Sequence, residues 1–342
     1  MRILLMATGG TIGSSIREVM DTERGMAALL PRLYAEGHAG QAREVAFDFL
    51  EPISILSENM TLPRLSALLR ALEAVDFTAY DGVILTHGSD TLSYTAAFVG
   101  LLFGRVGCPI VLVAADRPLE DPAGNGLSNF AGAVSLLASG KIKSGVFAVY
   151  RSASVTEVFL ATRMLEADGL HGIFRPFGTA PFGRIADGVF IPTAAPELPP
   201  LSDFAAVKGD ASRPGTDFSR PVWMLKSYPG LDYGMLDISR RPAAVLLVGY
   251  HSGTACTEGE GTSCLPFAAR LREAGVPVYF LPARAAGERV YASTAAMLAA
   301  GCRPLCGISP EAAYAKLCIG YNAFAKQVEA YLLQNVFYEY LD

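Results

Sequence analysis

The sequence has little charge, and the charge that it carries is slightly acidic. Charged residues make up 18% of the 342 positions, and 33 aspartates and glutamates outnumber 28 lysines and arginines, for a net charge of −5. Domains that bind nucleic acid are usually basic, so this balance argues against a nucleic-acid partner. Because 51% of the residues are hydrophobic, the composition also excludes an intrinsically disordered chain.

Long hydrophobic runs are lacking as well. The longest, around Ala96–Phe103, is closed by Arg105 and falls short of the roughly 20 residues that cross a bilayer. The apolar start of the chain is too short for a secretory signal and leads directly into the glycine-rich residues 8–13. No cluster of basic residues suits an anionic membrane surface. We therefore expect a cytoplasmic protein without a membrane partner.

Cysteine and histidine are few and scattered. Cys108 and Cys318 stand in apolar surroundings, which predicts reduced core residues rather than disulfides. Cys302 and Cys306 are four positions apart, but no second pair and no histidine accompanies them at ligand spacing. The four histidines form no metal-binding pattern either. The sequence therefore predicts no metal site.

Short apolar runs alternate with helical patterns along most of the chain. Runs such as Ile3–Ala7, Val83–Leu85 and Pro109–Ala114 indicate buried strands, and leucines recur at helical spacing from Leu62. Strands separated by helices imply right-handed connections and a mainly parallel sheet. The predicted fold is α/β, with a larger N-terminal, mainly parallel sheet flanked by helices and a smaller C-terminal α/β domain.

A stretch rich in proline and serine interrupts this pattern. Residues 186–220 contain five prolines, which favours an irregular connection. After it the alternation of strands and helices resumes on a smaller scale. We therefore expect an N-terminal domain of residues 1–185 that carries the functional site, an interdomain linker of residues 186–220, and a smaller domain of residues 221–342.

Three turns that follow predicted strands carry an unusual set of polar groups. They are residues 8–13, 56–61 and 86–91. Because the carboxyl ends of parallel strands meet along one edge of a sheet, we expect the three turns to open on the same side. Together they offer three hydroxyls and one carboxylate, which suits a small zwitterionic or amide-bearing ligand. These groups belong to Thr11, Ser57, Ser89 and Asp90.

Each turn taken alone also has a purely structural interpretation. Gly9 and Gly10 suit a tight turn, and Asp90 suits the N-cap of the following helix. The joint occurrence in three successive turns is what favours function. Other glycine-rich sites do not fit, because the G-x-G-x-x-G fingerprint, the Gly-Lys-Ser/Thr of a P-loop and the G-x-S-x-G elbow are all absent.

Two of the turns resemble the signature motifs of a known family. Thr8-Gly-Gly-Thr-Ile-Gly13 and Thr86-His-Gly-Ser-Asp-Thr91 are similar to the motifs of the L-asparaginase/glutaminase family, in its bacterial threonine-nucleophile type. Tyr228-Pro229-Gly230 resembles the start of that family's smaller domain. Ser309-Pro310-Glu311 resembles the beginning of the C-terminal helix in its cytoplasmic branch. The resemblance covers nearly the whole chain.

The resemblance implies a hydrolase that needs no cofactor, with residues 1–185 as the catalytic domain. A threonine hydroxyl attacks the side-chain amide carbon of L-asparagine, ammonia leaves, and water releases L-aspartate from the acyl-enzyme. By position, Thr11 is the nucleophile, and Ser89 and Asp90 complete the catalytic set. The implied substrate-binding residues are Ser57, Glu58, Gly88, Ser89 and Asp90.

Two residues of the family pattern have no counterpart here. The family supplies a tyrosine from a loop after the first motif, but residues 14–33 contain none. The family also has a lysine beside its second catalytic hydroxyl, and Arg163 or Glu166 takes that place, depending on the position of one gap. Arginine stays protonated, and a glutamate beside Asp90 brings like charges together, so neither is a good neutral base. The sequence predicts an L-asparaginase-like amidohydrolase with impaired activity.

Two other functions fit the same residues. One is an amino-acid-binding or regulatory protein on the asparaginase fold, and the other is an amidase for a different substrate. In each case the expected partner is a small molecule, either L-asparagine or a related amide. The high hydrophobic content and the family resemblance further imply a homodimer or homotetramer.

Overall fold

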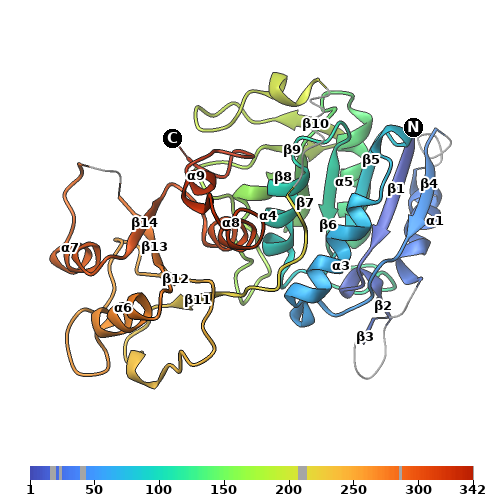
Figure 1. Ribbon diagram of the computed structural model, residues 1–342. Helices are drawn as coiled ribbons and strands as arrows, with labels where there is room; N and C mark the ends of the chain where they lie inside the picture. Colours follow the sequence, from blue (N-terminus) through green and yellow to red (C-terminus); the bar gives the residue numbers. More distant parts are fainter. Residues whose placement is uncertain (16–20, 23–24, 39–43, 207–213, 285–286, 342) are drawn as a thin grey trace. The chain divides into compact units, whose positions relative to one another are not determined.

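The protein consists of two compact units. The computed structural model describes the chain except residues 16–20, 23–24, 39–43, 207–213, 285–286 and 342. The first unit contains Met1–Thr216 and Val336–Tyr338, and the second contains Asp217–Asn335 and Glu339–Asp342 (Figure 1). The chain therefore returns to the first unit for a short segment near its end.

An eight-stranded sheet forms the centre of the first unit. The strand order is β10-β9-β8-β7-β6-β5-β1-β4. The strands from β7 to β4 in this order are parallel, whereas β8, β9 and β10 pair in antiparallel fashion. The bounds are β1 Arg2–Ala7, β4 Ala46–Leu50, β5 Gly82–Thr86, β6 Ile110–Val113, β7 Val146–Ser152, β8 Val155–Leu160, β9 Gly183–Ala186 and β10 Val189–Pro192. A short hairpin, β2 Ser14–Ser15 and β3 Asp21–Thr22, follows the first turn.

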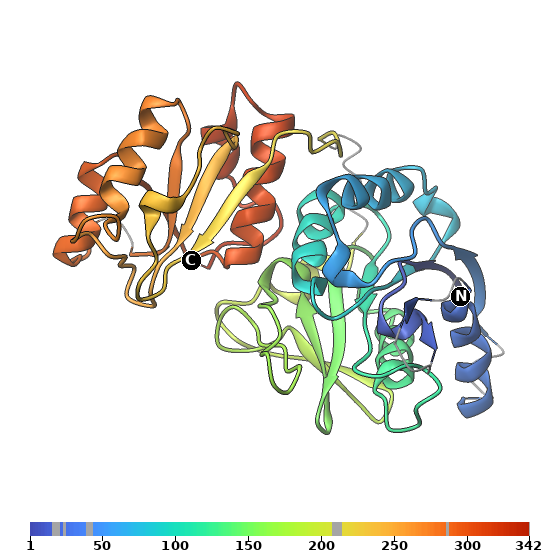
Figure 2. The ribbon, with the colours of Figure 1, turned by 90° about the horizontal axis from the view of Figure 1, so that it is seen from below.

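The central strands are apolar because helices cover both faces of the sheet. Every residue of β5 and β6 is buried, as expected for parallel strands covered on both sides. Figure 2 shows α3 and α4 on one face and α1 and α5 on the other. These helices are α1 Leu30–Gly37, α3 Leu62–Glu73, α4 Leu92–Phe103 and α5 Gly126–Ala138. The predicted α/β fold with a larger, mainly parallel sheet is confirmed.

One helical connection has an unexpected hand. The strands β5, β6 and β7 are consecutive parallel neighbours, yet α4 and α5 lie on opposite faces (Figure 2). The β5–α4–β6 and β6–α5–β7 connections therefore have opposite hands, and the prediction of uniformly right-handed connections is wrong. Aromatic contacts help to hold α5 on its face of the sheet. Phe130 contacts Tyr34 of α1 and Phe47 of β4, with ring centroids 5.9 and 5.6 Å away.

Part of the expected linker, residues 186–220, folds onto the first unit. Strand β10 pairs with β9, and a 3-10 turn, η6 Leu201–Phe204, follows. Phe190 and Phe204 are buried and contact Phe182, with ring centroids 6.1 and 5.1 Å away. These apolar contacts hold part of the stretch against the first unit, although its proline-rich composition predicts an irregular interdomain connection. Residues 207–213 lie outside the described residues, and the two units divide between Thr216 and Asp217.

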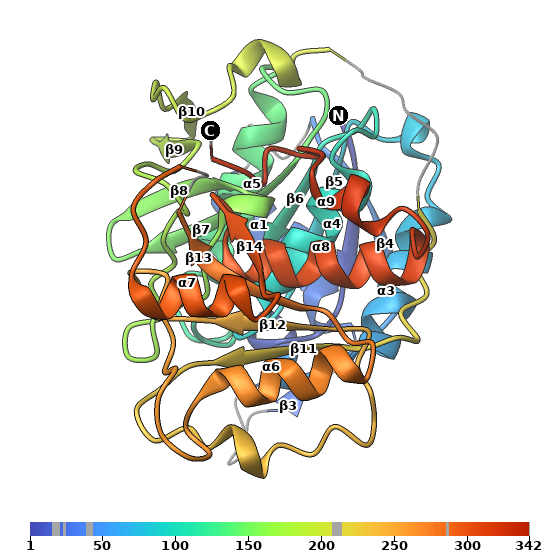
Figure 3. The same cartoon turned by 60° about the vertical axis from the view of Figure 1, so that its left-hand side comes forward.

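A four-stranded parallel sheet forms the second unit. Its order is β11-β12-β13-β14, and α6 and α8 lie on opposite faces of it (Figure 3). The bounds are β11 Val222–Lys226, β12 Ala244–Val248, β13 Val278–Ala283, β14 Arg303–Cys306, α6 Cys264–Glu273, α7 Ala292–Ala299, α8 Pro310–Ala323 and α9 Val328–Leu332. Its core includes Val245, Phe267, Leu271 and Phe280. The smaller α/β unit predicted for the C-terminal part is therefore present.

Candidate active site

The turn after β1 is tight because two glycines adopt left-handed backbone angles. Gly9 and Gly10 have φ values of 91° and 73°, which cost glycine little. A Cβ atom built on Gly10 would lie 2.4 Å from the backbone nitrogen of Gly88. Only glycine therefore lets the backbones of the two motif turns touch. Thr11 begins a 3-10 turn, η1 Thr11–Gly13, directly after this contact.

The turn after β4 reaches the same place. A Cβ atom built on Gly88 would lie 2.4 Å from the hydroxyl oxygen of Ser57. The Thr91 hydroxyl donates to the Ser57 carbonyl oxygen at 2.9 Å, and the Gly10 amide donates to the Ile55 carbonyl oxygen at 2.8 Å. The structure thus brings the three turns into direct contact within the first unit.

The candidate polar residues differ in their exposure to solvent. Ser57 is buried, Thr11 and Ser89 are half-buried, and Glu58 and Asp90 are exposed. Asp90 lies just before α4, where the positive end of the helix dipole favours a carboxylate. The arrangement offers hydroxyls at the contact of the turns and carboxylates at its rim, which suits a small ligand with a cationic group.

His87 is a residue of the site that sequence reasoning missed. Its side chain is completely buried, with Nδ1 2.8 Å from the Gly88 carbonyl oxygen and Nε2 2.9 Å from the Thr95 hydroxyl oxygen. Burial lowers the pKa of His87 to about 4, although the Gly88 carbonyl and Asp90 act in the opposite direction. The ring is therefore neutral at pH 7. Its position inside the second motif was the signal available in the sequence.

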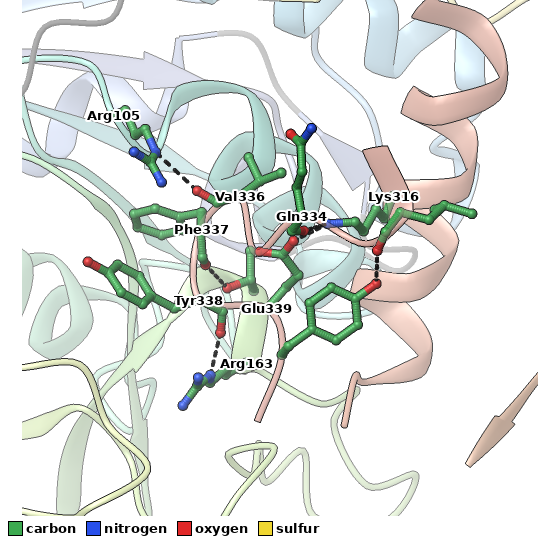
Figure 4. A network of polar contacts seen from close by, with 11 residues as sticks. Arg105, Arg163, Lys316, Gln334, Val336, Phe337, Tyr338 and Glu339 are labelled. Atoms are coloured by element: carbon green, nitrogen blue, oxygen red, sulfur yellow. Dashed lines mark hydrogen bonds and ion pairs between the residues drawn. The ribbon is translucent and has the colours of Figure 1, made fainter. Parts of the chain in front are cut away.

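Arg163 is engaged by the C-terminal segment of the chain (Figure 4). It closes the 3-10 turn η5 Ala161–Arg163, is only 6% exposed, and donates to the carbonyl oxygens of Tyr338 and Glu197. Two further bonds to the same segment run from Thr162 to the Phe337 carbonyl (2.7 Å) and from Arg105 to the Val336 carbonyl (3.1 Å). Arg163 thus anchors this segment in the first unit, and a guanidinium held in this way is no proton acceptor.

Glu166 lies beside the helix that follows the second motif. It is exposed and accepts a hydrogen bond of 3.4 Å from the hydroxyl of Tyr94, which stands four positions after Asp90 on α4. The structure therefore separates the two residues that compete for the place of the family lysine. Arg163 binds the C-terminal segment, whereas Glu166 faces α4.

The described part of the chain holds neither a metal-binding cluster nor a membrane-spanning helix. Outside the gaps given above, no group of three histidine, cysteine, aspartate or glutamate side chains is placed to hold a metal ion. Within the same residues, no helix has both the length and the apolar character that crossing a membrane requires.

Comparison with known proteins supports the sequence resemblance. Residues 2–191 match the family described as "Asparaginase, N-terminal". The curated relatives include a glutamyl-tRNA(Gln) amidotransferase subunit from Aeropyrum pernix, 26% identical over 92% of this chain and 73% of the relative. The subunit of the same name from Pyrobaculum aerophilum is 28% identical over 95% of this chain and 76% of its own length.

Solved structures show the same fold. The thermostable L-asparaginase from Thermococcus kodakarensis superimposes with a TM-score of 0.77 at 20% identity, over 100% of both chains. L-asparaginase I from Vibrio cholerae superimposes with a TM-score of 0.77 at 22% identity, over 100% of this chain and 99% of that one. At these sequence identities the similarity shows that the fold is shared, but it does not identify the substrate.

Proposed function

Since the chain belongs to the asparaginase family, we propose that it hydrolyses the side-chain amide of L-asparagine to L-aspartate and ammonia. One observation carries this proposal. Gly10 touches Gly88, and Gly88 touches Ser57, so the three motif turns share one location. This contact of the turns supports a site in which the Thr11 hydroxyl and the groups assigned to the amino acid act on the same small molecule.

The proposed reaction proceeds in two covalent steps. The Thr11 hydroxyl oxygen bonds to the side-chain amide carbon, the carbon–nitrogen bond breaks, and ammonia leaves with the hydroxyl proton. Water then attacks the resulting ester, releases L-aspartate and restores the Thr11 hydroxyl. Backbone amides of residues 88–90 supply hydrogen bonds to the oxyanion that forms on the carbonyl oxygen in each step.

The remaining polar groups hold the two ends of the amino acid. We assign the Ser57 hydroxyl to the α-carboxylate and the Asp90 carboxylate to the α-ammonium, because a carboxylate is the natural counter-ion of an ammonium. Ser89 supplies a second hydroxyl beside the reacting amide. Glu58 stands at the rim of the same turn as Ser57 and adds negative charge on the ammonium side.

We expect ammonia release from L-asparagine that is detectable but slow. Neither the loop tyrosine nor the lysine of the family is present, and proton transfer by a positioned group is worth about two to four orders of magnitude. The parent protein should therefore turn over more slowly than complete family members by about that factor. Ammonia release should be measured on L-asparagine, L-glutamine and a panel of other amides, and Glu166→Lys should raise the rate.

The outcomes of this assay separate the proposed function from its rivals. Turnover as fast as an ordinary asparaginase would show that another base serves Thr11. Ammonia release from a different amide alone would favour an amidase with another substrate. Binding of L-aspartate without ammonia release from any amide would favour an amino-acid-binding or regulatory protein.

Replacing Asp90 with asparagine should weaken the binding of L-aspartate. The change keeps the shape of the side chain and removes the counter-ion of the ammonium. A hydrogen bond to a charged group contributes about 1.5–3 kcal/mol, so the affinity should fall by about tenfold or more. Calorimetry at constant pH measures it, with Glu36→Gln, an exposed carboxylate change on α1, as the control. Equal affinities of Asp90→Asn and parent would remove Asp90 from the site.

The relatives favour a second candidate within the same chemistry. Proteins named as a subunit of glutamyl-tRNA(Gln) amidotransferase are similar to this chain over more than nine-tenths of its length. The alternative is therefore an ammonia-releasing subunit that acts on an amide amino acid together with a partner protein. A strong rise in ammonia release when such a partner is added would favour it over a self-contained hydrolase.

The oligomeric state and the cellular location of the protein are also proposals. We propose a cytoplasmic homodimer or homotetramer that binds a small molecule and needs no cofactor. Light scattering at low micromolar concentration measures the assembly, and a monomer mass would contradict it.

A further inference from the structure

We infer that His87 and Thr95 are positioning residues that orient the peptide between Gly88 and Ser89, so that the Ser89 amide faces the substrate. The inference rests on the proposed function, because it assigns a task within the same site. Three observations carry it: the hydrogen bonds of the buried ring, the geometry of the peptide, and the need for glycine at position 88.

The hydrogen bonds of His87 admit one arrangement of protons. The Gly88 carbonyl oxygen, 2.8 Å from Nδ1, can only accept, so Nδ1 carries the proton of the neutral ring. Nε2 is then an acceptor, and the Thr95 hydroxyl donates to it at 2.9 Å. His87 is 0% exposed and Thr95 is 1% exposed, so water does not compete for either nitrogen. The Gly88 carbonyl oxygen therefore determines the tautomer, and the Thr95 hydroxyl, by donating to Nε2, holds the ring in the orientation that faces Gly88.

The orientation of the Gly88 carbonyl determines that of the next amide. In a trans peptide the C=O of one residue and the N–H of the next point in opposite directions. With the Gly88 oxygen held toward the buried ring, the Ser89 N–H points away from it. In the part of the chain that the structure describes, no acceptor engages the Ser89 amide. A free, fixed amide is the kind of donor that stabilises an oxyanion.

Glycine at position 88 creates the need for such a restraint. The hydroxyl oxygen of Ser57 lies 2.4 Å from where a Cβ atom of residue 88 would stand, so a larger residue does not fit. Glycine, however, leaves its flanking peptides the widest choice of backbone angles. The hydrogen bond from the His87 ring to the Gly88 carbonyl oxygen supplies the restraint that glycine itself lacks. Because both ring nitrogens are already bonded, His87 is not available as a general acid or base.

A matched pair of variants at Thr95 tests the inference by kinetics. Thr95→Val keeps the shape of the side chain and removes the donor to Nε2, whereas Thr95→Ser keeps the donor. Loss of a whole oxyanion donor costs about 100- to 1,000-fold in kcat, so a misoriented one should cost about tenfold to 100-fold in Thr95→Val. KM should change by less than about twofold, because the groups that hold the amino acid are untouched. Thr95→Ser should retain the parent kcat, and equal kcat values for the two variants would overturn the inference.

Nuclear magnetic resonance tests it without any turnover. In parent protein with nitrogen-15-labelled histidine, the His87 signals, assigned by their loss in His87→Asn, should show the proton on Nδ1. The Ser89 amide signal should shift when L-aspartate is added, and the shift should be smaller in Thr95→Val. A proton on Nε2 in the parent would overturn the inference even if the protein released no ammonia. Correct tautomers without ammonia release would instead count against the proposed function alone.

Discussion

Replacing Thr11 with alanine is expected to reduce ammonia release to the background level. Thr11 begins η1 at the point where the first motif turn touches Gly88, and no other hydroxyl has the assigned place of the nucleophile. Loss of a nucleophile typically costs at least about three orders of magnitude in kcat. Because the parent rate is itself expected to be low, the residual rate should be indistinguishable from the uncatalysed reaction. A coupled ammonia assay with L-asparagine measures the change.

Two controls separate loss of the nucleophile from loss of the site. Thr11→Ser keeps the hydroxyl and should retain measurable turnover, although serine is freer to change its rotamer. Thr11→Ala should still bind L-aspartate, because the groups assigned to the two ends of the amino acid lie on the other turns. Ammonia release by Thr11→Ala near the parent rate would show that a different side chain attacks the amide.

The central part of the fold was predictable because it is encoded locally. The strands β1, β5 and β6 are continuous apolar runs that end in turns, so their place in a buried parallel sheet follows from the sequence. The antiparallel strands β8 to β10 were not predicted, since they are partly exposed and are not continuous buried runs. The hand of the β6–α5–β7 connection brings Phe130 into contact with Tyr34 and Phe47, residues far away in the sequence, and no local pattern reveals such contacts.

The candidate site shows the same division between local and distant information. The meeting of the three turns follows from the shared edge of parallel strands, so Thr11, Ser57 and Ser89 could be grouped in advance. The hydrogen bond from Arg163 to the Tyr338 carbonyl oxygen could not be predicted, because Tyr338 lies in a segment near the far end of the chain that returns to the first unit. His87 was missed because its role depends on a hydrogen bond with Thr95, which stands eight positions further along the chain.

The second large effect is expected at a buried ion pair in the second unit. Lys316 of α8 pairs with Glu339 and also donates to the Gln334 carbonyl oxygen (Figure 4). The two charged side chains are 1% and 0% exposed. The Lys316 nitrogen also lies 5.0 and 4.9 Å from the ring centroids of Tyr331 and Tyr340, so aromatic faces complete the enclosure. Burial lowers the pKa of Lys316, and the Glu339 carboxylate counteracts this.

Lys316→Met should destabilise the second unit by about 3–5 kcal/mol, because it removes the positive charge that pairs with the buried Glu339 carboxylate. The only tryptophan of the chain, Trp223, packs against the core of this unit. Its fluorescence therefore reports the unfolding of the second unit in urea. The matched exposed control is Arg284→Met, which removes the partner of Glu288 in a pair about half exposed and should change the stability by less than about 1 kcal/mol.

A double variant distinguishes the loss of the opposite charge from lost packing. In Lys316→Met with Glu339→Leu, both charges of the buried pair are gone, so most of the lost stability should return. The Gln334 carbonyl then lacks its donor, and a deficit of about 1–3 kcal/mol should persist for that reason. If the double variant were as unstable as Lys316→Met, the packing of the lysine side chain, and not its charge, would be what stabilises the unit. A Lys316→Met protein within about 1 kcal/mol of the parent would contradict the burial of the pair itself.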